Sequence, residues 1–70
     1  MDKEMARILI SAVDFGITGT QFHENGGMSL IFKDAEAATR FMQALDPSLV
    51  NCLAYSSFLG YPTLQITLKE

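Results

Sequence analysis

Few residues in this sequence have side chains that could do chemistry, and His23, the only histidine, is followed directly by Glu24. Adjacent residues on a strand point to opposite faces, so these two cannot by themselves form an acid/base pair or a metal cluster. A serine or cysteine nucleophile would have to use His23 as its base, and no spacing in the sequence places a serine or Cys52 beside it. A chain of 70 residues also rarely encloses a ligand pocket of ~300 Å³ or more. We therefore predict no catalytic residue and a protein that is not an enzyme.

Cys52 is the only cysteine, so the chain can form no internal disulfide and has no second thiol for a zinc site. We expect this thiol to act as a small apolar residue, and we expect no metal and no cofactor. The opening Met1-Asp2-Lys3-Glu4 is too acidic for a signal peptide, and no apolar run approaches the ~20 residues of a membrane span. These features predict a cytoplasmic protein with no membrane partner.

The charge and composition narrow the class of protein further. Five basic and eight acidic residues leave a net charge of −3, which is the wrong sign for a broad phosphate-binding surface and argues against nucleic acid as a partner. Hydrophobic residues make up 49% of the chain and charged residues 19%, as in a globular domain. We predict a single domain over residues 1–70.

The first element is predicted to be a helix over residues 2–15. Asp2 can cap its start, and Gly16 can adopt the left-handed conformation that ends it. Placed at about 100° per residue, the polar positions gather on one side of this helix. The apolar positions fall opposite and are expected to face the core: Met5, Ile8, Leu9, Ala12 and Val13.

A β-hairpin is predicted next, with strands over residues 18–24 and 28–33. Asn25-Gly26-Gly27 between them favours a tight turn, because asparagine and glycine tolerate positive φ. A three-residue loop gives the most amphipathic arrangement. One face then carries Thr20, Phe22, Met28, Leu30 and Phe32, and the other carries Gln21, His23, Ser29, Ile31 and Lys33.

A second helix and a second hairpin complete the chain. Asp34 caps the helix, which runs to about Leu45, and Asp46-Pro47 ends it. Its apolar positions are Ala37, Ala38, Phe41, Met42 and Leu45. Two strands follow, over residues 51–58 and 63–69. The last one alternates with Leu64, Ile66 and Leu68 inward, whereas the strand before it has apolar residues on both faces, so we expect both of its faces to be covered.

The element order is therefore α-β-β-α-β-β. We predict an α+β fold, a two-layer α/β sandwich in which a four-stranded, mostly antiparallel sheet carries two helices on one face.

One stretch of the sequence is unusual, because no charged residue occurs from Pro47 to Leu68. Two central strands without room for charges would explain this. The alternative is a surface that a partner covers, since exposed strand edges usually carry charges that prevent edge-to-edge pairing. Aromatic and large apolar side chains near the turn would be the anchors of that interface. The candidate partner-binding residues are Tyr55, Phe58, Leu59 and Tyr61.

This surface leads to our functional hypothesis, a non-enzymatic protein-binding module. It could be a small inhibitor of the kind that phages and mobile elements encode, which occludes a working surface of a target protein. A homodimer through the same uncharged hairpin is compatible with it. The alternative is a nucleic-acid or small-ligand-binding regulatory domain that uses the open sheet face. The residues expected to converge on that face are Gln21, His23, Ser29, Ile31, Lys33, Gln65, Thr67 and Lys69.

Overall fold

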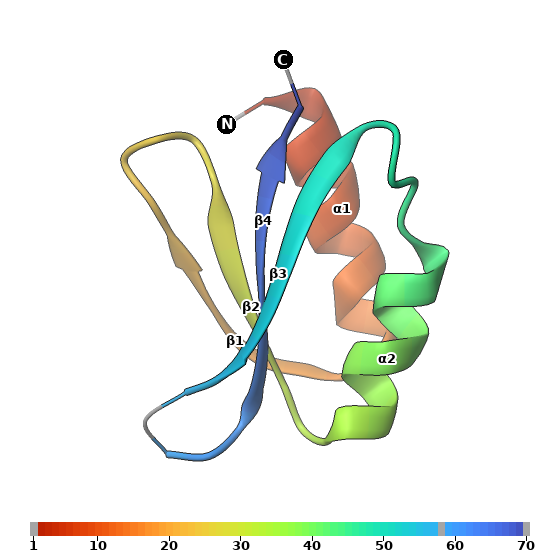
Figure 1. The fold of residues 1–70 in the computed structure, drawn as a ribbon, viewed down its shortest axis with the longest axis vertical. Coiled ribbons are helices and arrows are strands. Elements are labelled where there is room, and N and C mark those ends of the chain that lie inside the picture. Colours follow the sequence, from red (N-terminus) through yellow and green to blue (C-terminus); the bar gives the residue numbers. More distant parts are fainter. Residues whose placement is uncertain (1, 58, 70) are drawn as a thin grey trace.

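The computed structural model describes residues 2–57 and 59–69, and its elements follow the predicted order. They are α1 (Lys3–Asp14), β1 (Ile17–Phe22), β2 (Met28–Phe32), α2 (Ala35–Ala44), β3 (Val50–Ser56) and β4 (Pro62–Leu68). The four strands form one sheet in the order β1-β2-β4-β3, and every neighbouring pair is antiparallel. Both helices lie on the same face of this sheet, and the other face is open (Figure 1). The predicted two-layer α+β fold is confirmed.

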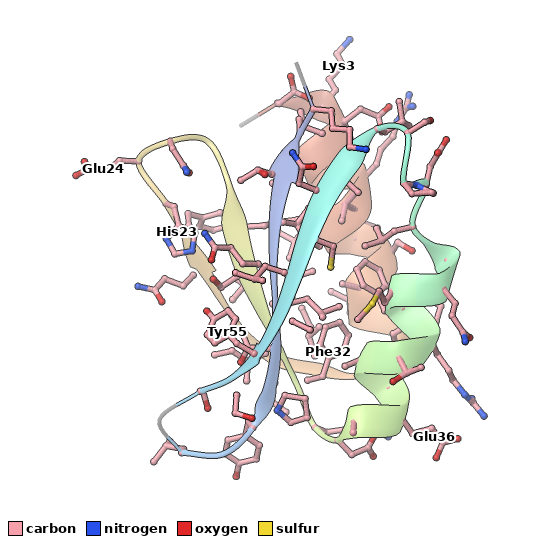
Figure 2. The ribbon with its side chains drawn as sticks, in the orientation of Figure 1. Lys3, His23, Glu24, Phe32, Glu36 and Tyr55 are labelled. Atoms are coloured by element: carbon pink, nitrogen blue, oxygen red, sulfur yellow. The ribbon has the colours of Figure 1, made fainter. Side chains whose placement is uncertain are left out.

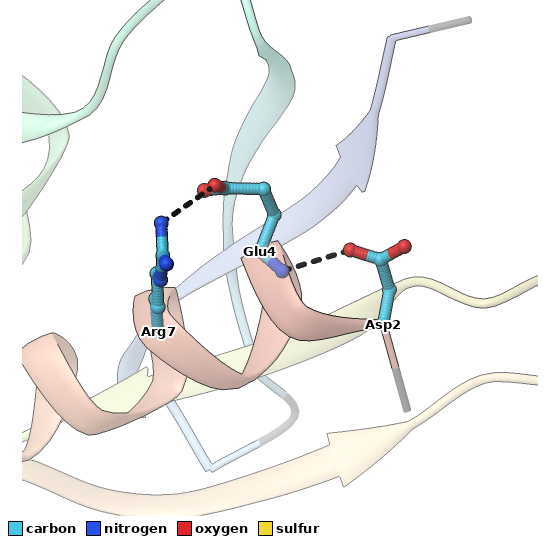
Figure 3. A network of polar contacts seen from close by, with 3 residues as sticks. All are labelled: Asp2, Glu4 and Arg7. Carbon is cyan, nitrogen blue, oxygen red and sulfur yellow. Dashed lines mark hydrogen bonds and ion pairs between the residues drawn. The ribbon is translucent and has the colours of Figure 1, made fainter.

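Both ends of α1 have the predicted signals. The Asp2 carboxylate accepts a hydrogen bond from the Glu4 backbone N–H at 2.8 Å, and Glu4 also pairs with Arg7 at 3.3 Å (Figure 3). At the other end Gly16 has φ of +87°, which a residue with a side chain rarely adopts. The helix is therefore capped at its first turn and stopped by glycine.

The first hairpin has the predicted faces but a loop displaced by one residue. The His23 N–H donates to the Gly27 carbonyl at 2.9 Å, so the three loop residues are 24–26 rather than 25–27. Gly27 is instead pressed against β4, where a Cβ atom would lie 2.7 Å from the Thr67 methyl and 2.9 Å from the Ile66 carbonyl oxygen. This close contact leaves room only for glycine at position 27, which lies on the strand side of the loop. Gly26, with φ of +88°, is the residue that makes the turn.

The core lies between the helices and the two central strands, β2 and β4. Phe41 of α2 contacts two other rings, Phe15 edge-on at 5.3 Å between centroids and Phe32 at 5.5 Å. Our prediction that Val13 and Met42 face the core is wrong, because Val13 is 60% exposed and Met42 is 39% exposed. Both lie at the margin of the apolar face of their helix, where the core leaves them exposed. The fully or almost fully buried apolar residues are Met5, Ala12, Met28, Leu30, Phe32, Ala37, Ala38, Phe41, Val50, Leu64 and Ile66.

The second hairpin corrects our expectation that the third strand is covered on both faces. β3 is an edge strand, paired with β4 alone, and on the open face Leu53 is 63% exposed and Tyr55 42%. β4 is central, and its alternation is as predicted, with Leu64 and Ile66 buried and Leu68 partly buried. Gly60, with φ of +86°, shapes the turn between the two strands.

Neither helix is of the length and apolar character that crossing a bilayer would require, over the residues that the structure describes.

Candidate functional site

A chain of three polar side chains crosses the open face of the sheet. His23 Nε2 lies 2.7 Å from Ser29 Oγ, and Ser29 Oγ lies 3.1 Å from Tyr55 Oη. His23 directly follows β1, Ser29 is on β2 and Tyr55 is on β3. His23 and Tyr55 lie on the side of the sheet opposite to Phe32, which points toward the helices (Figure 2). These hydrogen bonds therefore connect side chains from three parts of the sheet, on the face that carries no helix.

The strand register brings these side chains together. One row of residues across the four strands consists of Gln21, Ser29, Gln65 and Leu53. In the next row Thr63 of β4 pairs with Tyr55 of β3. His23 is two residues beyond Gln21, so it is a diagonal neighbour of Ser29 on the same face. Tyr55 reaches back over the central strand β4 to meet Ser29 on β2.

Ser29 and Thr63 are buried although they lie on the open face, and each is only 2% exposed. Both hydroxyls have hydrogen-bond partners, since Thr63 donates to the Tyr61 carbonyl at 3.2 Å and Ser29 bonds His23 and Tyr55. These hydrogen bonds matter for stability, because a buried hydroxyl without a partner lowers the free energy of unfolding by about 1–3 kcal/mol. Short polar side chains in the centre of this face are thus overlain by longer neighbours.

This arrangement can hold side chains in place but is poorly suited to nucleophilic attack. A Ser–His pair activates serine when the hydroxyl can reach a substrate and a third group orients the histidine. Here the Ser29 oxygen is enclosed, and no carboxylate bonds His23 in the described part of the chain. Glu24 is exposed in the hairpin loop, as Figure 2 shows. The three-residue chain fixes the Tyr55 ring against the sheet with one edge free.

Large exposed apolar side chains gather on β3 and on the turn that follows it. Leu53 is 63% exposed, Tyr55 42%, Leu59 67% and Tyr61 46%. Tyr61 has the strand parity of Thr63, and the Ser57 N–H donates to its carbonyl, which places its side chain on the open face with Tyr55. We call these four residues, Leu53, Tyr55, Leu59 and Tyr61, the β3–β4 surface.

Three of the four residues predicted to bind a partner are on this surface, namely Tyr55, Leu59 and Tyr61. Phe58 is the fourth, and it lies outside the described residues. Leu53 was missed, because apolar residues on both faces of this strand indicated a covered strand. Ser29 was missed as a partner of His23. The sequence did contain a signal for this contact, since the predicted hairpin places His23 and Ser29 on the same face.

The two lysines expected on the open face lie at its ends. The Lys33 side chain packs against Gly16, so that a Cβ atom added to Gly16 would lie 3.2 Å from Lys33 Cε. Lys69 Nζ donates a hydrogen bond to the Pro47 carbonyl at 2.5 Å. The middle of the face therefore offers amide, hydroxyl and imidazole groups without a lysine or arginine. Within residues 2–57 and 59–69, no cluster of three or more histidine, cysteine or acidic side chains could hold a metal ion.

Cys52 lies on the helix-facing side of β3, half-buried against the core. Burial raises the pKa of its thiol above the ordinary value, because a thiolate would lose hydration there. The raised pKa makes this thiol a weak nucleophile, in keeping with a packing role.

Comparison with known protein families, with characterised proteins and with solved structures finds no match to this chain. The functional argument therefore rests on the geometry of the molecule alone.

Proposed function

We propose that this chain is a non-enzymatic protein-binding module whose contact area is the β3–β4 surface. The observation that carries the proposal is the exposure of four large apolar side chains, between 42% and 67%, within a stretch that has no charged residue. Clustered exposed apolar residues of this kind mark interaction sites in soluble proteins. Tyrosine and leucine side chains at such a site exclude water when a partner docks on them.

The hydrogen bonds of Tyr55 support this role. Its hydroxyl is held by the buried Ser29, which limits the rotation of the ring before any partner arrives. A ring that is already ordered loses less conformational entropy on binding. Tyr55 would therefore form the fixed centre of the interface, with Leu53 on one side and Tyr61 on the other.

The mode of action that fits such a surface is occlusion. A domain of this size can cover ~800 Å² of a partner, which is enough to block a working surface of the target. Inhibition of the target is the functional consequence that we expect.

The test is affinity capture from the native host with three forms of the tagged chain. We expect a partner that binds the unmodified chain and the control Leu49→Lys but is lost with Leu53→Lys. Leu49 is 48% exposed and lies outside the surface, so it matches the substitution in type and exposure. Isothermal titration with the purified partner should then show at least a tenfold weaker Kd for Leu53→Lys, about 1.4 kcal/mol. Equal binding by both variants would refute the proposed surface.

The second candidate is a regulatory domain that binds nucleic acid or a small ligand on the open face. It is supported by the uncharged polar side chains of Gln21 and Gln65, which flank the buried Ser29, with His23 beside them. The positions of Lys33 and Lys69 at the ends of the face weaken it for nucleic acid, because phosphate contacts dominate that affinity. Salt-dependent binding of a labelled single-stranded oligonucleotide, lost in Gln65→Ala, would favour it over the protein-binding module.

A further inference from the structure

The hydrogen-bond relay on the open face, which consists of His23, Ser29 and Tyr55, can run in two directions. Ser29 Oγ has one proton to donate and can accept further hydrogen bonds. Its partners are His23 Nε2 at 2.7 Å and Tyr55 Oη at 3.1 Å, and Ser29 itself is only 2% exposed. The single proton of Ser29 therefore goes either to His23 or to Tyr55, and the other residue must donate to Ser29.

The two directions differ in what Tyr55 offers on its outer side. When Ser29 donates to His23, the Tyr55 hydroxyl donates to Ser29, and only its lone pairs remain for an outside group. When His23 donates to Ser29, Ser29 donates to Tyr55, and the proton of Tyr55 is left for an outside acceptor. Tyr55 is 42% exposed, so water or a docked partner can take up this outer hydrogen bond. The direction of the relay therefore decides whether Tyr55 is an acceptor or a donor.

A charged His23 permits only one of these directions. Both ring nitrogens of a charged imidazole carry a proton, so Nε2 can then only donate, whereas one nitrogen of a neutral imidazole accepts. The 2.7 Å separation between His23 Nε2 and Ser29 Oγ is usual for a hydroxyl donor and short for an N–H donor. The geometry therefore favours Ser29 as the donor while His23 is neutral.

Few charged groups surround His23, which is half-buried. None of the four strands contains a charged residue, and Lys33 and Lys69 lie at the ends of the open face. Glu24 is exposed in the adjacent loop, and Tyr55 is the other titratable group in the relay (Figure 2). Histidine is the side chain that ordinarily changes its charge between about pH 5 and 8, so His23 is the group on this face that responds near neutral pH.

We propose that protonation of His23 reverses the relay and turns the Tyr55 hydroxyl from an acceptor into a donor at the β3–β4 surface. One proton from solvent is bound at Nε2. The protons of Ser29 and Tyr55 stay on their own oxygens and only rotate about the C–O bonds, so no covalent bond in the relay breaks. The charge on the imidazole also polarises both hydroxyls, which makes Tyr55 a stronger donor.

The consequence for binding rests on the proposed function. A partner that places a backbone carbonyl or carboxylate oxygen against Tyr55 meets a donor when His23 is charged. The same oxygen meets a second acceptor when His23 is neutral, and the hydrogen bond is then lost. We infer that the partner presents such an oxygen and binds about threefold more tightly, or better, on the acid side of the His23 titration.

NMR of the purified chain, without a partner, tests the relay. The ¹⁵N shifts of the imidazole report which nitrogens of His23 carry a proton, and the ¹³Cζ shift of a tyrosine reports the hydrogen bonds of its hydroxyl. We expect neutral His23 to carry its proton on Nδ1, and the Cζ shift of Tyr55 to change with the same midpoint as His23. Tyr61 shares the β3–β4 surface but is not in the relay, so its Cζ shift should not follow.

Two substitutions show whether the response passes through the hydroxyls. Ser29→Ala removes the middle of the relay and should abolish the Tyr55 response while His23 still titrates, whereas the control Ser56→Ala should leave the response unchanged. If circular dichroism shows that Ser29→Ala does not fold, His23→Gln replaces it and should make the Tyr55 Cζ shift independent of pH between about pH 5 and 8.

Three results would overturn the relay. One is a Tyr55 Cζ shift that does not follow His23 in the unmodified chain. Another is a neutral His23 with its proton on Nε2, because the direction would then not change. The third is a Tyr55 response that persists in Ser29→Ala or is equalled by Tyr61, since the charge would then act through space.

Binding measurements separate this proposal from the proposed function. With the captured partner, isothermal titration at about pH 5.5 and about pH 8 should show the expected change in Kd, and Tyr55→Phe should remove it. A Kd that does not depend on pH, while Leu53→Lys still weakens binding, would overturn the inferred acceptor and leave the β3–β4 surface in place. Equal binding by Leu53→Lys and the unmodified chain would refute the surface, and the NMR titration would still decide the relay.

Discussion

The two edge strands of the sheet are alike in charge and opposite in the face that carries their exposed apolar residues. β1 and β3 both lack a charged side chain. Beside β1 the exposed apolar residues, Phe22, Val13 and Ile10, lie in the helix layer. On β3 the exposed residues Leu53 and Tyr55 lie on the open face.

The difference follows from where the helices stop. α1 packs over β1, but Ile10 and Val13 of α1 and Phe22 of β1 stay exposed in the helix layer. The open face has no helix at all, so every large side chain that β3 directs there stays in contact with water. β1 therefore has its exposed apolar neighbours in the helix layer, whereas β3 presents its own on the open face, where a partner can contact them.

The largest expected effect separates the core from the β1 edge on the same face of the sheet. Phe32→Ala should lower the free energy of unfolding by about 3–5 kcal/mol, because it empties a fully buried site against Phe41. Phe22→Ala should cost less than about 1 kcal/mol, because Phe22 is 55% exposed. Urea unfolding followed by circular dichroism measures both.

A loss for Phe22→Ala as large as that for Phe32→Ala would show that the apolar layer closes over the β1 edge, and the contrast between the edges would fail.

An intermediate effect is expected where β3 is tied to the rest of the open face. Ser29→Ala leaves His23 and Tyr55 without their shared partner and should lower the free energy of unfolding by about 1–2 kcal/mol. The control Ser56→Ala, at the exposed end of β3, should change it by less than about 0.5 kcal/mol. Urea titrations of the two variants give the comparison.

Ser29→Ala also distinguishes the two edges by their dynamics. Ring flipping of Tyr55, followed by NMR, should become faster in this variant, whereas Phe22 on β1 should not respond. An unchanged Tyr55 together with an unchanged stability would mean that the hydrogen-bonded chain does not hold the ring.

The smallest effect concerns the helix-facing side of β3, through Cys52. Burial raises the pKa of this thiol in the folded state, so above the ordinary value of 9.0 the unfolded chain loses the proton first. The contribution of Cys52 to stability is then complete at neutral pH and falls as the pH rises through the alkaline range. Cys52→Ala removes this dependence. Urea unfolding at neutral pH and above pH 9 should show a steeper alkaline loss for the unmodified chain than for Cys52→Ala, and equal slopes would mean that the thiol is hydrated.

Much of the fold could be predicted because short-range patterns carry it. Asp2 and Asp34 cap the helices through local hydrogen bonds, with Asp34 accepting from the Ala37 N–H at 2.8 Å. The alternation around Leu64 and Ile66 set the inward face of the last strand. The loop of the first hairpin was predicted one residue late, because the contact of Gly27 with β4 is between segments far apart in the sequence.

The candidate site was predicted less completely. Tyr55, Leu59 and Tyr61 stood out as aromatic or large apolar residues in an uncharged stretch, but Leu53 was read as covered. Its exposure depends on the position of β3 at the edge of the sheet, and the strand order β1-β2-β4-β3 is not written in any local pattern.

The sequence by itself determined the element order, the inward faces of the second and fourth strands and the absence of charge from Pro47 to Leu68. These are properties of single segments, set by side-chain periodicity, capping and turn residues. Only the tertiary structure decided that Ser29 meets His23 and Tyr55, and that the apolar surplus of the two edges lies on opposite faces. Those features depend on strand order and on how far each helix extends over the sheet, which are set by packing between segments distant in the chain.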